Sequence, residues 1–209
     1  VERIMSGRAR HVAVVGVDPS ASQLSGDSIR ELYGYSFDFW TDGLAGVTAT
    51  SLYALSWQAF AAGTGGTVAD LNAVTLKNRN NAMLNPNAHL PRQHDTEEFA
   101  TSPQIASPFC RLHCSPLSDG AAALILTNSD AAPDLRRKTA PQITGIGSAS
   151  DFPGLGHREN PGKFVAKTLA AKRAMKMAGI SASDIAVAEV YDAYAGAELQ
   201  GIAALGLSD

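Results

Sequence analysis

The feature that most constrains the fold is a strand-to-helix transition near the end of the chain. Residues 185–190 are apolar and partly β-branched, a pattern typical of a short buried strand. From Ala195 onward, apolar residues recur at helical spacing until Gly206, which predicts the helix end. Residues 191–194, Tyr-Asp-Ala-Tyr, join the two elements at the carboxyl end of the predicted strand. Open α/β sheets bind ligands at such positions, so we expect chemistry there, with the Tyr191 phenol as a proton donor or, once deprotonated, a base.

The remaining pattern predicts a layered α/β protein with a long, mostly helical insertion. Strands are expected at residues 11–17, 121–127, 142–147 and 185–190, and the first two are predicted to be fully buried. Helices are expected at residues 51–62, from 68 onward, at 163–178 and from 195, with a capping signature at Thr67-Val-Ala-Asp70. Glycine stops are expected at Gly63, Gly65 and Gly66 for the first helix, at Gly179 for the third and at Gly206 for the last. Residues 130–141 form a predicted polar connector. This order of elements is that of an α/β fold.

An aromatic cluster follows the first predicted strand. Its members are Tyr33, Tyr35, Phe37, Phe39 and Trp40. One interpretation is that these rings pack a small subdomain. The other is that some of them line an apolar ligand tunnel.

Composition narrows the class of protein. The chain has 209 residues, of which 45% are hydrophobic, so it can bury a core. A net charge of −3 without long basic runs argues against nucleic-acid binding. Apolar runs such as residues 121–126 are far shorter than the roughly 20 residues of a membrane span, so none is expected. Cys110 and Cys114 make neither a disulfide framework nor a four-ligand zinc site, and we expect a reducing, cytoplasmic setting.

Four stretches of the sequence together resemble a known family. They are Val-Ala-Val-Val-Gly-Val-Asp (12–18), Lys-Asn-Arg-Asn-Asn-Ala-Met-Leu-Asn-Pro-Asn-Ala-His (77–89), Cys-Ser-Pro-Leu-Ser-Asp-Gly-Ala-Ala-Ala-Leu-Ile-Leu (114–126) and Val-Tyr-Asp-Ala-Tyr (190–194). In this order and spacing they resemble the middle of a thiolase. The similar branch is that of the sterol-carrier-protein thiolases and the lipid-transfer-protein-like thiolase homologues.

The resemblance implies a thiolase-like, layered α-β-α-β-α architecture, present here in part. Such proteins consist of two βαβαβαββ halves. Residues 1–130 would be the end of the N-terminal half, including an inserted loop domain at about residues 19–117. Residues 131–209 would be the start of the C-terminal half. Because the chain begins at Val1 without an initiator methionine, we expect it to be a central segment of a longer protein.

The family's other motifs are expected outside this segment. Thiolases use a nucleophilic cysteine in the first half and a Gly-His motif in the second, which would lie before residue 1 and after residue 209. Cys110 and Cys114 do not match the nucleophile, and we expect them to be buried or edge thiols. The resemblance implies a coenzyme A thioester as substrate, with no tightly bound cofactor and no metal. By itself the segment is expected to be inactive.

The polar motif distinguishes two chemistries. Sterol-carrier-type enzymes have His-Asp-Cys-Phe where this chain has Tyr-Asp-Ala-Tyr at residues 191–194. An imidazole titrates at about pH 6.5, whereas a phenol titrates at about pH 10 and is almost always a hydrogen-bond donor. The motif is similar to the Tyr-Asp-Ala-Phe of aldolases in steroid side-chain degradation, which form no acyl-enzyme and work with an OB-fold partner. Tyr191 and Asp192 are therefore the candidate catalytic residues. Tyr194 is expected to pack, and Asp192 has a second interpretation as a helix cap.

Other polar residues are weaker candidates. Lys77, Arg79 and Arg92 have charges suited to coenzyme A phosphates, although they are also consistent with solvated surface charges. The histidines have no metal-site spacing and are expected to be surface or packed residues: His89, His94, His113 and His157.

The leading hypothesis is retro-aldol cleavage of a β-hydroxyacyl-CoA derived from lipid or steroid chains, with Tyr191 as the acid/base. One alternative is thiolytic acyl transfer by a cysteine outside the segment. Another is a scaffold subunit without activity of its own. A homodimer is expected, with an OB-fold protein as a possible further partner.

Overall fold

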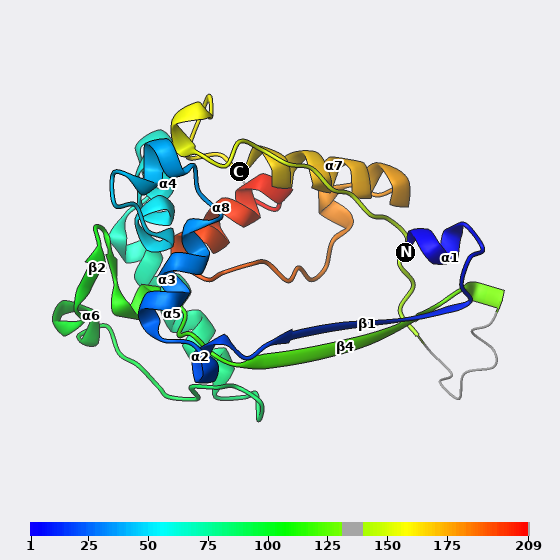
Figure 1. Cartoon of the computed structure of the whole chain (residues 1–209), viewed down its shortest axis with the longest axis horizontal. Helices are drawn as coiled ribbons and strands as arrows, with labels where there is room; N and C mark the ends of the chain where they lie inside the picture. Colours follow the sequence, from blue (N-terminus) through cyan, green and yellow to red (C-terminus); the bar gives the residue numbers. More distant parts are fainter. Residues whose placement is uncertain (131–139, 209) are drawn as a thin grey trace. The chain divides into compact units, whose positions relative to one another are not determined.

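The computed structural model describes residues 1–130 and 140–208, which belong to two compact units (Figure 1). The first unit takes residues 1–25 and 117–143, and the second takes residues 26–116 and 144–209. Each unit is therefore built from two separate stretches of the chain. The predicted connector at residues 130–141 lies mostly outside the described residues. The division into halves at residue 130 stays a prediction.

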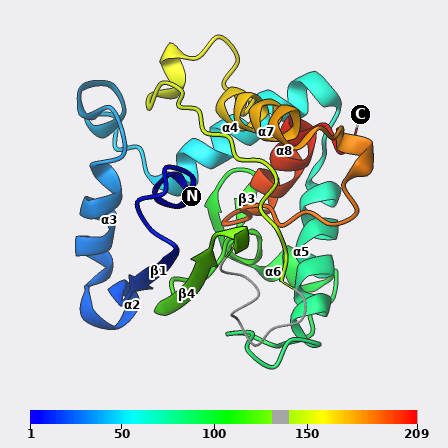
Figure 2. The ribbon, with the colours of Figure 1, turned by 90° about the vertical axis from the view of Figure 1, so that its right-hand side faces the viewer.

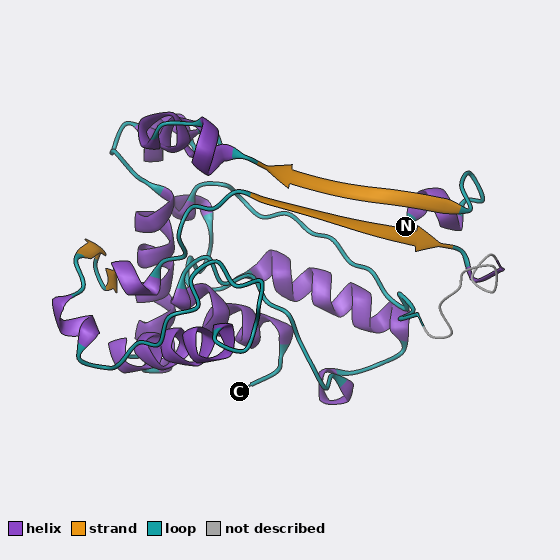
Figure 3. Cartoon of the chain, turned by 90° about the horizontal axis from the view of Figure 1, so that it is seen from below, coloured by secondary structure: helices purple, strands orange, loops and turns teal. Residues whose placement is uncertain are grey.

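The first unit is a two-stranded antiparallel ribbon (Figure 3). Strand β1 (His11–Asp18) pairs with β4 (Gly120–Thr127), from His11 opposite Thr127 to Asp18 opposite Gly120. Helices α1 (Glu2–Met5) and α2 (Ser20–Gln23) flank β1. The Asp119 carboxylate accepts a hydrogen bond of 3.0 Å from the amide of Ser22, which ties the two stretches together. Both predicted strands are confirmed in position.

The predicted burial of these strands is wrong. Most side chains of the ribbon are exposed, and Ile125 keeps 67% of its surface. The described residues of this unit supply two strands and two four-residue helices, which is too little surface to cover both faces of the ribbon.

The second unit is mainly helical. Its long helices are α3 (Gly26–Gly34), α4 (Ala49–Thr64), α5 (Val68–Ala82), α7 (Val165–Ala178) and α8 (Ala195–Leu205). Shorter elements are η1 (Phe39–Gly43), α6 (Glu98–Thr101), β2 (Gln104–Ala106), β3 (Phe109–Cys110), η2 (Arg111–His113), η4 (Leu155–His157) and η5 (Ala182–Asp184). Helix α8 packs against α4, α5 and α7 (Figure 2).

The helix ends follow the sequence signals. The predicted capping box opens α5, where the Asp70 carboxylate accepts a hydrogen bond of 2.7 Å from the amide of Thr67. Helices α4, α7 and α8 end at Gly65, Gly179 and Gly206, each with a left-handed backbone at φ of 78°, 70° and 71°. Glycine adopts this conformation without a Cβ clash, so the predicted stops at Gly179 and Gly206 are confirmed. Of the three glycines predicted to end α4, Gly65 is the cap and Gly63 lies inside the helix.

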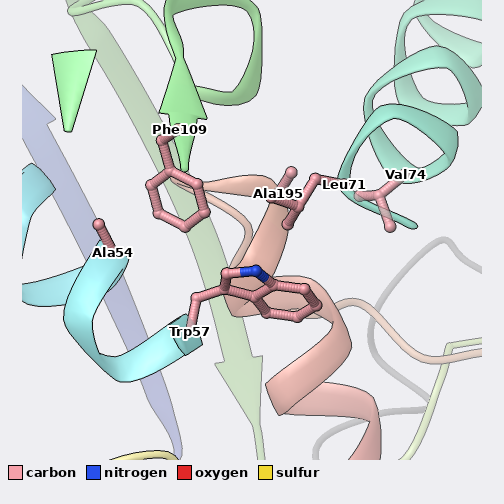
Figure 4. Packing of buried hydrophobic residues seen from close by; sticks show 6 residues of the cluster. All are labelled: Ala54, Trp57, Leu71, Val74, Phe109 and Ala195. Atoms are coloured by element: carbon pink, nitrogen blue, oxygen red, sulfur yellow. The ribbon is translucent and has the colours of Figure 1, made fainter. Parts of the chain in front are cut away.

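The core of the second unit lies where α4, α5, α8 and β3 meet (Figure 4). Its buried members are Ala54, Trp57, Leu71, Val74, Phe109 and Ala195. Gly196 lets α8 approach, because a Cβ there would lie 3.0 Å from the Trp57 ring and 3.1 Å from the Phe109 ring. This core fixes the start of α8, and with it residues 191–194.

Two predicted strands are absent from the described chain. Residues 142–147 and 185–190 are irregular. Gly145 and Gly147 run directly against α7, where an added Cβ would come within 2.1 Å and 2.0 Å of the carbonyl oxygens of Ala174 and Ala170. Apolar runs become strands only beside a hydrogen-bonding neighbour, and none of the described strands of this unit pairs with them.

The aromatic cluster is largely exposed. Trp40 keeps 78% of its surface, and Tyr33, Tyr35 and Phe39 are exposed as well. The Phe39 and Trp40 rings contact each other edge to face, with centroids 5.4 Å apart. The interpretation that these rings pack a subdomain is therefore wrong for these four residues, and the tunnel interpretation stays a prediction.

Candidate active site

The Tyr-Asp-Ala-Tyr motif is anchored at the amino end of α8. Tyr194 is the residue that precedes the first turn of the helix. The carbonyl of Ala193 accepts a hydrogen bond of 2.9 Å from the amide of Ser115, and Cys114 forms a β-bridge with Tyr194. The motif is therefore held between α8 and the segment that follows η2.

Tyr194 packs, as predicted. Its ring stacks on Phe109 with centroids 5.8 Å apart and lies against Tyr53 with centroids 4.7 Å apart. Its hydroxyl is 3.0 Å from the Thr50 hydroxyl. Burial raises the pKa of Tyr194, so the phenol stays protonated and structural.

Tyr191 differs from Tyr194 in its exposure. The residue keeps 61% of its surface, so it is not sealed inside packing. Partial burial raises the pKa of Tyr191, and nearby Tyr33 and Asp192 raise it further, while a hydrogen bond with Tyr53 lowers it. The balance is a pKa above the ordinary tyrosine value rather than a lowered one. At rest, Tyr191 is therefore a proton donor.

Asp192 does not cap α8. The helix has no side-chain capping bond at its N-terminus. The Asp192 carboxylate instead accepts a hydrogen bond of 3.1 Å from the side-chain amide of Asn78 on α5. The capping interpretation is wrong because this carboxylate is directed to a neighbouring helix.

A buried carboxylate, that of Glu198, shares a hydrogen-bond donor with Asp192. Glu198, in α8, is 4% exposed and accepts a hydrogen bond of 2.7 Å from the same Asn78 amide. The Lys77 ammonium completes the cluster as an ion pair with Glu198. A charge removed from water needs such partners, because an unpaired one costs several kcal/mol. Sequence reasoning missed Glu198, although a glutamate among the apolar residues of a helix was a usable signal.

A cleft of about 240 Å³ opens beside this cluster. It is lined by Val74, Thr75, Asn78, Arg79, Ala82, Ala88, His89, Leu90, Leu112, His113, Cys114, Ser115, Pro116, Asp192 and Ala195. Asp192 and Arg79 thus share one hollow, which places a carboxylate and a guanidinium within reach of the same ligand.

The three predicted phosphate-binding cations are separated. Arg79 lines the cleft, whereas Lys77 is engaged with Glu198. The Arg92 guanidinium pairs with Glu98 at 2.9 Å and does not line the cleft.

His113 and the two cysteines form a buried cluster. His113 is 3% exposed, and its Nδ1 accepts a hydrogen bond of 3.2 Å from the backbone amide of Cys110. We therefore assign its proton to Nε2, which donates to the side-chain Oδ1 of Asn72 at 2.8 Å. Burial lowers the pKa of His113 to about 4 and raises the pKa of Cys114 to about 11. Cys110 is buried and Cys114 is partly buried, as predicted for both thiols, and the raised pKa of Cys114 disfavours its thiolate.

Of the other histidines predicted to be surface or packed residues, two are near carboxylates and one lies in the cleft. His94 Nδ1 is 3.1 Å from a Glu98 oxygen, and His157 is 3.9 Å from Asp38. His89 lines the cleft. Across residues 1–130 and 140–208, no three histidine, cysteine or acidic side chains gather in a way that could hold a metal ion.

None of the helices in the described part of the chain is long and apolar enough to cross a lipid bilayer.

Comparisons with known proteins found related sequences and similar folds. The family model "Thiolase C-terminal domain-like" matches residues 147–209. An acetyl-CoA acetyltransferase of Methanocaldococcus jannaschii is 34% identical over 93% of this chain, and sterol carrier protein 2 of Oryctolagus cuniculus is 30% identical over 63%. A solved "Ltp2-ChsH2(DUF35) aldolase" superposes over 99% of this chain and 54% of its own, with a TM-score of 0.85 and 23% identity.

The fold is thiolase-like and of the α/β class, as predicted. The chain belongs to the thiolase superfamily, in the group of sterol-carrier-protein thiolase homologues. It spans about half the length of the curated relatives it matches, or less: 49% of the archaeal protein and 25% of the mammalian one.

Proposed function

We propose that the protein cleaves a carbon–carbon bond of a β-hydroxyacyl-CoA thioester by a retro-aldol reaction, with Tyr191 as the acid/base. The observation that carries this proposal is an exposed phenol at the amino end of α8, adjacent in sequence to a carboxylate that lines a cleft. The structural neighbour named as an aldolase supports the same chemistry.

The reaction needs one proton to be moved and returned. The Tyr191 phenolate accepts the proton of the β-hydroxyl group, the bond between Cα and Cβ breaks, and Cβ becomes a carbonyl. The bonding electrons pass to Cα and form the thioester enolate, which takes a proton back from Tyr191. Because the pKa of Tyr191 is raised, the phenolate fraction limits the first step and the phenol is a competent acid for the last.

Asp192 and Arg79 have supporting roles in this proposal. Asp192, held by Asn78, orients polar groups of the substrate in the cleft. Arg79 contributes the charge for a phosphate of coenzyme A. Lys77 and Arg92 are secondary phosphate contacts, since each already pairs with a glutamate.

The test is an assay of the full-length protein on a β-hydroxyacyl-CoA, with and without a partner protein. Tyr191→Phe is expected to lower the cleavage rate by roughly 10²–10⁴-fold. Tyr194→Phe is the matched control, because it removes a phenol of the same motif that packs in the core. Full activity of Tyr191→Phe would overturn the assigned role.

Thiolytic acyl transfer is the second candidate, and the similarity to an acetyl-CoA acetyltransferase favours it. The products separate the two reactions. Retro-aldol cleavage releases a carbonyl compound and consumes no free coenzyme A, whereas thiolysis consumes one coenzyme A for each bond broken. A protein that does neither would be a scaffold subunit.

The assembly is also part of the proposal. The aldolase neighbour is named as a complex of two proteins, which supports a search for a partner of this chain. An OB-fold partner, a homodimer, a lipid or steroid acyl chain and a cytoplasmic setting stay predictions.

A further inference from the structure

Lys167 is a half-buried lysine that packs on aromatic rings. It belongs to α7, and its ammonium lies 4.4 Å from the ring centroid of Phe164 and 5.8 Å from that of Tyr191. A Cβ added to Gly201 of α8 would lie 3.7 Å from the same nitrogen. The ammonium is therefore held beside α8 and two rings, one of which belongs to the candidate acid/base.

No carboxylate of the described residues forms an ion pair with Lys167. Burial alone lowers its pKa. A lysine in a merely structural role would more commonly reach water or an acidic partner. The groups near the Lys167 ammonium are instead the rings of Phe164 and Tyr191.

A cation near the face of a phenol ring acts on the protonation of that phenol. The ring quadrupole attracts the ammonium, and the attraction grows when the ring carries the delocalised charge of a phenolate. The ammonium therefore favours the phenolate over the phenol. Partial burial, Tyr33 and Asp192 raise the pKa of Tyr191 and so favour the phenol, whereas the hydrogen bond with Tyr53 lowers it and favours the phenolate, as the ammonium does.

We propose that Lys167 is a positioning residue for Tyr191. Its ammonium lies near the face of the Tyr191 ring, where it orients the ring and stabilises the phenolate. The effect of Lys167 on catalysis depends on the proposed function, in which Tyr191 is the acid/base. The electrostatic coupling between the two side chains is measurable without substrate.

The test is a titration of Tyr191 in the full-length protein, followed by the ring-carbon NMR signal that disappears in Tyr191→Phe. Lys167→Met keeps the length of the side chain and removes the charge, and it is expected to raise the pKa of Tyr191 by roughly half a unit. Lys167→Arg is expected to restore most of the original value. Lys172→Met is the matched control, because it removes an exposed charge from the same helix and should leave Tyr191 unchanged.

A reciprocal measurement covers the case in which Lys167→Met does not fold. Linkage requires that the phenolate raise the pKa of Lys167 where the two titrations overlap, so Tyr191→Phe should lower the apparent pKa of Lys167. The side-chain carbon signal of Lys167 reports this directly. No shift of either group, or equal shifts from Lys167→Met and Lys172→Met, would overturn the proposal.

Activity separates this inference from the proposed function. If Tyr191→Phe abolishes cleavage but Lys167→Met leaves the Tyr191 titration unchanged, the positioning role fails alone. If the two titrations are coupled but Tyr191→Phe keeps full activity, the coupling stands and the retro-aldol role of Tyr191 fails.

Discussion

The ribbon of β1 and β4 and the first half of α8 have similarly apolar sequences but opposite environments. Ile125 in β4 is mostly exposed, whereas Ala197 of α8 is fully buried and even Glu198 and Gln200 are buried beside it. The neighbours make the difference, because α8 packs against α4, α5 and α7. Burial is decided by the surfaces that an element meets, and composition alone does not supply them.

Truncation of one core ring and one ribbon side chain tests this contrast most strongly. Phe109→Ala should lower the free energy of unfolding by about 3–5 kcal/mol, since it leaves a cavity against Trp57 and Ala195. Ile125→Ala should change it by less than about 0.5 kcal/mol. Chemical denaturation of both variants measures the difference. A comparable loss from Ile125→Ala would mean that the ribbon is covered in the folded protein.

The buried carboxylate of α8 gives the next largest effect. Glu198→Ala removes the acceptor of Asn78 and the ion-pair partner of Lys77, and we expect a loss of about 2–3 kcal/mol. Glu189→Ala is the control, because that glutamate is exposed. Equal stability of the two variants in thermal or chemical unfolding would show that the buried cluster contributes nothing to the fold.

The buried imidazole of His113 should make the stability of the second unit depend on pH. The folded protein holds His113 with a pKa of about 4, whereas the ordinary value is 6.5, so the unfolded chain binds more protons between these limits. This contribution to stability is fully present above about pH 6.5 and is lost as the pH falls toward 4, by about 3 kcal/mol. The measurement compares unfolding free energies of the natural protein and His113→Gln across this range. An unchanged pH dependence in the variant would contradict the assignment.

Local signals in the sequence predicted the helical framework well. The Thr67–Asp70 capping box and the stops at Gly179 and Gly206 depend on residues within one turn of the helix end, and all are confirmed. The strands at residues 142–147 and 185–190 were predicted from apolar runs alone. They failed because a strand also needs a partner that a local pattern does not contain.

The candidate site was predictable only in part. The position of Tyr191 ahead of a helix was visible in the sequence. The link from Asn78 to Glu198 joins residues 120 positions apart, and no local pattern brings them together. For the same reason, Asp192 was assigned as a possible cap when its partner lies on α5. Contacts across the fold decided the electrostatics of the site.

The pH dependence of cleavage tests the central claim most directly. Because burial and neighbouring groups raise the pKa of Tyr191, the rate on a β-hydroxyacyl-CoA should still be rising at the ordinary tyrosine pKa of about 10. Tyr191→Phe should abolish this rise, after correction for spontaneous thioester hydrolysis. The same rise in Tyr191→Phe, or a natural enzyme whose rate is already constant near neutral pH, would contradict the role of Tyr191 as the acid/base.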